Sequence, residues 1–140
     1  MLRRYLSFAF FCAGLLLMIS GCASRARVVD ISGYSFDVSP VYFSKSPNIK
    51  VDCGGSRMEF PLSALRNVKI DRTRITSIDG RLYFGAEIEL KDGNIYGKSQ
   101  DKGRCFVCAD NGIAGRSSKS DYFVSFDKLN GFTVLDKDDK

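Results

Sequence analysis

Thiols are the most reactive side chains that this sequence brings together. Three of its five cysteines, Cys53, Cys105 and Cys108, lie in the part of the chain that is patterned like a folded domain. Cys53 is on the apolar side of an alternating strand pattern, so a disulfide from Cys53 to Cys105 or to Cys108 is the favoured interpretation. A bridge between Cys105 and Cys108, or three buried unpaired thiols, are the alternatives.

The segment Cys105-Phe106-Val107-Cys108 has the spacing of a dithiol redox motif. Such a motif needs a helix N-terminus to lower the pKa of its first thiol, whereas this run is typical of a strand. The chain contains no histidine, which removes the commonest general base and metal ligand. The sequence therefore predicts no metal, no catalytic residues and no enzyme activity, with a thiol-based redox enzyme as the minor alternative.

Basic and aromatic side chains form a candidate binding patch on predicted strands and loops. The alternative is a purely structural role for the same residues, in a second packed face or in ordinary cross-strand pairs. The formal charge is +5, and loss of Arg3 and Arg4 with a signal peptide would leave +3. A charge this mild predicts neither nucleic-acid nor nucleotide binding. The patch consists of Arg81, Tyr83, Tyr96, Lys98, Arg104 and Arg116.

Residues 1–21 have the layout of a secretory signal peptide. Arg3 and Arg4 precede an apolar run of about 14 residues, which as a helix would reach roughly 21 Å, against about 30 Å of bilayer hydrocarbon. Two small residues, Ser20 and Gly21, end the segment. The run is therefore too short for a comfortable permanent span.

The end of this segment, Ile19-Ser20-Gly21-Cys22, resembles the lipobox of bacterial lipoproteins. The resemblance covers residues 1–23 and implies cleavage before Cys22, whose thiol carries a diacylglyceryl group and whose new amine is usually acylated. It implies no cofactor beyond this covalent lipid, and Ala23, rather than Asp, favours the outer membrane. Ordinary secretory cleavage near Gly21 and an uncleaved signal anchor are the alternatives.

Alternating apolar residues predict an all-β domain over residues 28–135, after a lipidated tether at 22–27 and before a frayed tail at 136–140. Residues 81–90 alternate for ten positions after the turn Asp79-Gly80, and we expect them to form the central strand. No segment has twelve residues at helical spacing. The expected fold is a small antiparallel sandwich or partly open barrel of hairpins, with at most one or two short helical turns.

Two segments of the domain share a pattern, which indicates two related β units. Residues 60–70 can be laid over residues 124–134, each with a helical turn led by Ser63 or Asp127. Upstream, residues 49–54 match residues 88–93. This alignment predicts an insertion between about Gly97 and Ser120 in the second unit, with 115–120 as a loop tip.

Together these features favour a non-enzymatic binding or assembly module, lipid-anchored in the outer membrane and facing the periplasm. Its exposed strand edges would contact an envelope protein partner. A surface-exposed lipoprotein that binds a small ligand, a glycan or a host factor is the alternative.

Overall fold

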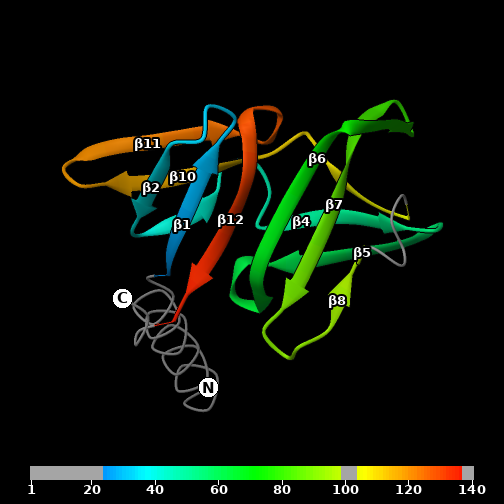
Figure 1. The fold of residues 1–140 in the computed structure, drawn as a ribbon, viewed down its shortest axis with the longest axis horizontal. Helices are drawn as coiled ribbons and strands as arrows, with labels where there is room; N and C mark the ends of the chain where they lie inside the picture. The colour runs from blue at the N-terminus through cyan, green and yellow to red at the C-terminus, as the bar shows by residue number, and fades with distance from the viewer. Residues whose placement is uncertain (1–23, 99–103, 137–140) are drawn as a thin grey trace, which may run out of the picture.

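The computed structural model describes residues 24–98 and 104–136, and there the protein is all β (Figure 1). Two antiparallel sheets pack in a sandwich-like arrangement that does not close into a barrel. The described residues contain two single 3₁₀ turns, η1 and η3, and no α-helix. The predicted all-β sandwich with short helical turns is therefore confirmed.

The chain runs through two successive series of six strands. A short 3₁₀ turn precedes the last strand of each series, and the tight turn Asp79-Gly80 connects the two. The first half consists of β1 (Arg25–Asp30), β2 (Ser35–Val38), β3 (Val41–Phe43), β4 (Asn48–Cys53), β5 (Ser56–Pro61), η1 (Leu62–Ala64) and β6 (Leu65–Ile78). The second half consists of β7 (Arg81–Leu90), β8 (Ile95–Tyr96), β9 (Cys105–Cys108), β10 (Gly112–Ser117), β11 (Ser120–Ser125), η3 (Phe126–Lys128) and β12 (Leu129–Leu135).

The two halves exchange strands instead of folding side by side. The large sheet has the order β2-β1-β12-β6-β7-β9-β4-β5, with β8 also on β7, and the small sheet has the order β11-β10-β3. Thus β1 pairs with β12 of the second half, and β7 pairs with β6 of the first. In the same way β3 pairs with β10, and β9 pairs with β4.

The strand registers show that the halves have the same backbone plan. Hairpin β4–β5 pairs Asn48 with Pro61, and hairpin β10–β11 pairs Gly112 with Ser125, so that each residue corresponds to the one 64 positions later. Where the halves meet, Val68 lies opposite its own counterpart Phe132. A residue lies opposite its own counterpart only at a two-fold symmetry axis. The two halves of this chain are therefore related by an approximate two-fold axis.

Irregular features of the backbone repeat as well. The pairing of β1 with β12 skips Asn130, and the pairing of β7 with β6 skips Arg66, its counterpart 64 positions earlier. The turns after β1 and β7 each place a glycine at positive φ, Gly33 and Gly93. The backbone bond from Ile31 N to Lys128 O likewise recurs from Lys91 N to Ala64 O. Shared bulges and turns make a duplicated unit the simplest account of the fold.

One hydrophobic core serves both halves. Its largest fully buried side chains include Phe126 and Phe132 from the second half and Ile49 and Leu65 from the first. The ring of Phe43, from β3, packs edge-on against both phenylalanines. Since each half contributes strands to the sheets of the other, neither half encloses a core alone.

The predicted central strand, 81–90, is β7 with the expected bounds, and it lies between β6 and β9 in the large sheet. Four of the five residues on its predicted apolar face are buried, and the fifth, Leu82, is not. This residue is exposed because hairpin β6–β7 projects beyond the sheet (Figure 1).

Three other expectations need correction. Segments 60–70 and 124–134 do share one succession of elements, but the counterpart of β4 is β10, not residues 88–93. The predicted insertion within 97–120 is instead occupied by β9 and β10, the counterparts of β3 and β4, and 115–117 is strand. The first strand begins at Arg25, inside the predicted tether 22–27. Cys22 and tail residues 137–140 lie outside the described residues.

Candidate binding surfaces

The structure divides the six predicted patch residues among separate surfaces. Arg81 and Tyr83 line a basin between hairpin β4–β5 and the end of hairpin β6–β7. Tyr96 and Arg104 line a second hollow, beside the disulfide. Arg116 lies on hairpin β10–β11, where its guanidinium donates to the carbonyl of Lys119.

The last of the six, Lys98, is exposed at the edge of the described residues. Tyr96, on β8, packs on Phe60 of β5 with ring centroids 5.8 Å apart, although β8 pairs with β7 and β5 pairs with β4.

The basin has a volume of about 410 Å³ and a mixed charge. Three cations, Lys50, Arg57 and Arg81, line it together with Glu59 and Asp79. Arg57 pairs with Asp79 at 2.5 Å and lies 3.8 Å from Asp52, so part of its positive charge is already neutralised. The basin therefore has the size of a small-ligand site and a weak preference for anions.

The three cysteines in the described part of the chain form one disulfide, between Cys53 and Cys105 on the neighbouring strands β4 and β9. This confirms one of the two favoured pairings. Cys108 is a buried free thiol beside Tyr83. Burial raises the pKa of Tyr83, and the hydrogen-bonded Cys108 adds to this shift. All three cysteines lie on strands, so none has the helix N-terminus that a reactive dithiol uses.

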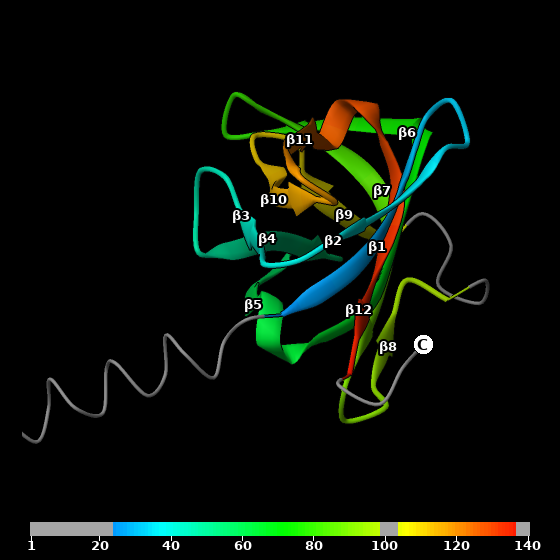
Figure 2. The same ribbon diagram turned by 90° about the vertical axis from the view of Figure 1, so that its left-hand side faces the viewer.

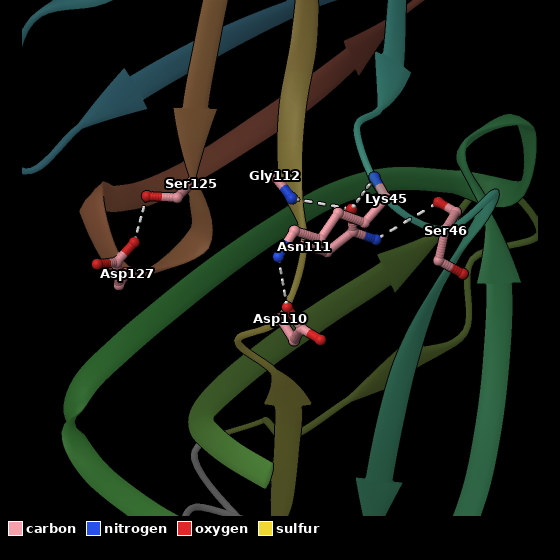
Figure 3. Close-up of polar contacts among 7 residues, drawn as sticks. All are labelled: Lys45, Ser46, Asp110, Asn111, Gly112, Ser125 and Asp127. Atoms are coloured by element: carbon pink, nitrogen blue, oxygen red, sulfur yellow. Dashed lines mark hydrogen bonds and ion pairs between the residues drawn. The ribbon is translucent and has the colours of Figure 1, made fainter.

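A polar cluster at the start of β10 fastens the loop between β3 and β4 (Figure 3). The buried amide oxygen of Asn111 accepts hydrogen bonds from the backbone N–H groups of Lys45 and Gly112, at 3.1 and 2.9 Å. Its amide nitrogen donates to the carbonyl of Ser46. The Lys45 ammonium donates to Asp110 at 2.9 Å and lowers the pKa of that carboxyl. The bonds of Asn111 are all internal, which indicates a structural role.

Four of the large exposed hydrophobic residues belong to two segments at one end of the molecule, the upper end in Figure 1. Two belong to the turn after β1 and two to hairpin β6–β7. Both segments lie at the top in the two views (Figure 2), with the η3–β12 junction between them. We call this set the distal pole: Ile31, Tyr34, Ile75 and Leu82.

Comparison with the counterpart turn shows that the fold does not require these apolar groups. The turn after β1 has exposed Ile31 and Tyr34, where the turn after β7 has exposed Lys91 and Asn94. Both turns have the same backbone hydrogen bonds. The backbone of this turn therefore does not require Ile31 and Tyr34, and their exposed apolar side chains are available for a contact with another protein.

The other two large exposed hydrophobic residues flank Ala114 on the outer face of the small sheet. Tyr42, on β3, and Phe123, on β11, are both cross-strand neighbours of Ala114. Their side chains are 56% and 62% exposed. Tyr42 also lines a groove of about 520 Å³ that begins at Ser24, which we call the Ser24 groove; it is formed by residues 24, 41–47 and 61–63.

Sequence reasoning missed the distal pole. In the sequence Tyr34 alternates with Phe36 and Val38, as in a strand, and Leu82 lies on the apolar face predicted for residues 81–90. Alignment of 31–34 with 91–94 would have exposed the contrast, but residues 88–93 were aligned with 49–54 instead.

Among residues 24–98 and 104–136 no cluster of three or more histidine, cysteine or acidic side chains could hold a metal ion. The same residues include no helix with the length and apolarity needed to cross a bilayer. Comparison of the chain with models of known protein families, and with curated protein sequences, found no match.

Proposed function

We propose that this protein is a lipid-anchored, non-enzymatic binding or assembly module of the bacterial cell envelope. Cys22 carries the lipid after removal of residues 1–21, and the domain faces the periplasm from the outer membrane. Its partner is an envelope protein. The lipobox resemblance of residues 19–22 supports the anchor, and two or more acyl chains hold a protein stably where one does not.

The observation that carries the binding role is the contrast between the two ends of β1. Ser24, next to the anchor, precedes this strand, while exposed Ile31 and Tyr34 follow it, about 17 Å further along. The anchored end would therefore lie at the bilayer, and the distal pole would project away from it. Binding of a partner protein would bury the apolar side chains of the distal pole.

Two measurements test this function. Intact mass of the membrane-extracted protein should give a chain that begins at Cys22 and carries lipid, and Cys22→Ser should abolish that species. Crosslinking in intact cells, followed by purification through the anchored protein, should recover one stable envelope partner. Normal maturation and membrane retention of the serine variant would refute the anchor.

Ligand binding by a surface-exposed lipoprotein is the second candidate, and the basin at Tyr83 favours it. Its volume and its three cations fit a small anionic ligand or an acidic glycan. Protease treatment of whole cells distinguishes the candidates. Loss of the domain under this treatment would support surface exposure, whereas protection would support the periplasmic module.

A further inference from the structure

We propose that the Ser24 groove, with the rings of Tyr42 and Phe123 beside it, is the surface on which this domain rests against the lipid bilayer. The inference deepens the proposed function and depends on the lipid at Cys22. It adds an orientation and assigns the membrane interface as the partner of one face.

Chain length places the anchor at this groove. Two Cα–Cα steps, at most about 7.6 Å, separate Cys22 from Ser24. The carbonyl of Ser24 accepts a hydrogen bond of 3.1 Å from the N–H of Val41, so Ser24 is fixed against β3. Figure 2 shows β1 starting next to η1, whose residues form another wall of the groove. Acyl chains on Cys22 would enter the bilayer directly beside these residues.

The lining of the groove suits a membrane interface. Of its eleven residues, six are apolar or aromatic, four are serines, and Lys45 is the sole charged one. The ammonium of Lys45 is paired with Asp110, which leaves almost no net charge at the groove. Such a surface fits the glycerol and upper acyl region of zwitterionic lipids better than an anionic headgroup.

The two rings extend this surface across the small sheet. Phe123 Cε2 and Ser44 Oγ lie 2.9 and 3.0 Å from the point where a Cβ on Gly112 would stand, so the ring borders the groove. Transfer to a bilayer interface stabilises tyrosine and phenylalanine side chains that are exposed on a folded domain. At the interface tyrosine also keeps its hydroxyl hydrated.

Counterpart residues in the other half show that the fold does not impose this chemistry. Glu59 stands where the second half has Phe123, and Asp127 stands where the first half has Ser63. The counterpart of Ser24 is Phe84, where the chain continues into hairpin β6–β7. The apolar groove, whose lining residues include no acid, thus occurs at the end of the domain from which the chain leads to Cys22.

Tryptophan fluorescence tests the orientation, since the chain has no tryptophan of its own. Lipidated Tyr42→Trp and, separately, Phe123→Trp would be reconstituted into phosphatidylcholine vesicles with brominated acyl chains. For both we expect several-fold quenching relative to unbrominated vesicles, and an emission maximum shifted to the blue relative to tryptophan at position 34. Tyr34→Trp, at the distal pole, is the matched control and should keep its emission.

The outcomes separate this proposal from the one on which it depends. If mass analysis finds no lipid on Cys22, both proposals fail. If the lipid is present and tryptophan at 42 and 123 is quenched no more than tryptophan at 34, the anchor stands and the docking surface is refuted. Having two reporters keeps the test decisive when one substitution disturbs folding.

Discussion

The two halves of this chain have nearly the same backbone and different surfaces. Hairpins β4–β5 and β10–β11 share strand length, a two-residue connection and register. The outer face of the first carries Lys50 and Glu59, whereas the same positions of the second carry Ala114 and Phe123. Strand pairing and core packing are compatible with either pair of surface side chains. The differences on the surface therefore reflect function and not folding.

The two equivalent strand pairs that join the halves, β4–β9 and β10–β3, also differ in covalent support. Cys53 and Cys105 join β4 to β9, but their counterparts Ser117 and Ser39 on the other side are not joined. The backbone there still pairs, with a bond of 2.8 Å from Ser39 N to Arg116 O. The pair β3–β10 is thus held by hydrogen bonds alone, where the corresponding pair β9–β4 also has a disulfide.

The largest expected effect comes from the shared core. Phe126→Ala should cost about 3–5 kcal/mol and Leu62→Ala, its counterpart, about 2–5 kcal/mol. Because the halves exchange strands, each variant should unfold in one transition, measured by circular dichroism in urea. Phe126→Leu, which copies the first half, should cost less. Two separated transitions would mean that the halves are independent.

Loss of the disulfide should follow in size. Replacing Cys53 and Cys105 by alanine should lower the free energy of unfolding by about 4 kcal/mol in the chain-entropy model, because the bridge closes a loop of 52 residues. Denaturation of the variant and of reduced wild-type protein should agree. Equal stability with and without the bridge would contradict this.

Symmetry offers the converse experiment. Ser39→Cys together with Ser117→Cys should form a second disulfide, since the N–H of Ser39 bonds to the carbonyl of Arg116, the residue before Ser117, in the strand pair that corresponds to β9 and β4. The expected gain is at most about 4 kcal/mol. Thiol titration and peptide mapping would check it, and two free thiols at 39 and 117 would refute the equivalence of the strands.

Asn111→Ala should have a smaller effect, a loss of about 1–3 kcal/mol, because the N–H groups of Lys45 and Gly112 lose their acceptor. Its counterpart in the first half is Pro47, which has no polar side chain to lose. Pro47→Ala is therefore the control and should cost clearly less in the same denaturation assay. Equal losses for both would argue against the hydrogen-bond account.

The smallest effect concerns alkaline pH. An ordinary tyrosine ionises near pH 10, and burial raises the pKa of Tyr83 above that value in the folded protein. The resulting stabilisation is complete below about pH 10 and disappears as the pH rises through the folded pKa. Tyr83→Phe should therefore lose stability less steeply between about pH 9 and 11. Parallel curves for both proteins would contradict this.

The regular part of the fold could be predicted because strands with one buried face alternate. For residues 81–90 this pattern predicted both the bounds of the strand and its central position in the sheet. The 60–70 and 124–134 segments likewise revealed one repeated succession. Cys53 was placed on an apolar face, which led to its pairing, although the choice between Cys105 and Cys108 needed the strand register.

Surface and topology could not be predicted in the same way. Strand exchange depends on which distant strands meet, and hydrophobic alternation does not specify partners. Residues 115–117 looked like a loop tip because of glycine, arginine and serine, yet β3 and β11 pair with them and hold them in a strand. Tyr34 alternates like a core residue but stands in a turn beyond the sheet.

We propose above that the chain is anchored through Cys22, beside Ser24, and that it binds its partner at the distal pole. A photo-crosslinking amino acid at Tyr34 and, in a second variant, at its counterpart Asn94 tests it in living cells, because the two turns match in backbone and exposure. The account predicts one envelope protein crosslinked from position 34 and none from 94. Crosslinks from 94 alone, or equal crosslinks from both, would contradict it.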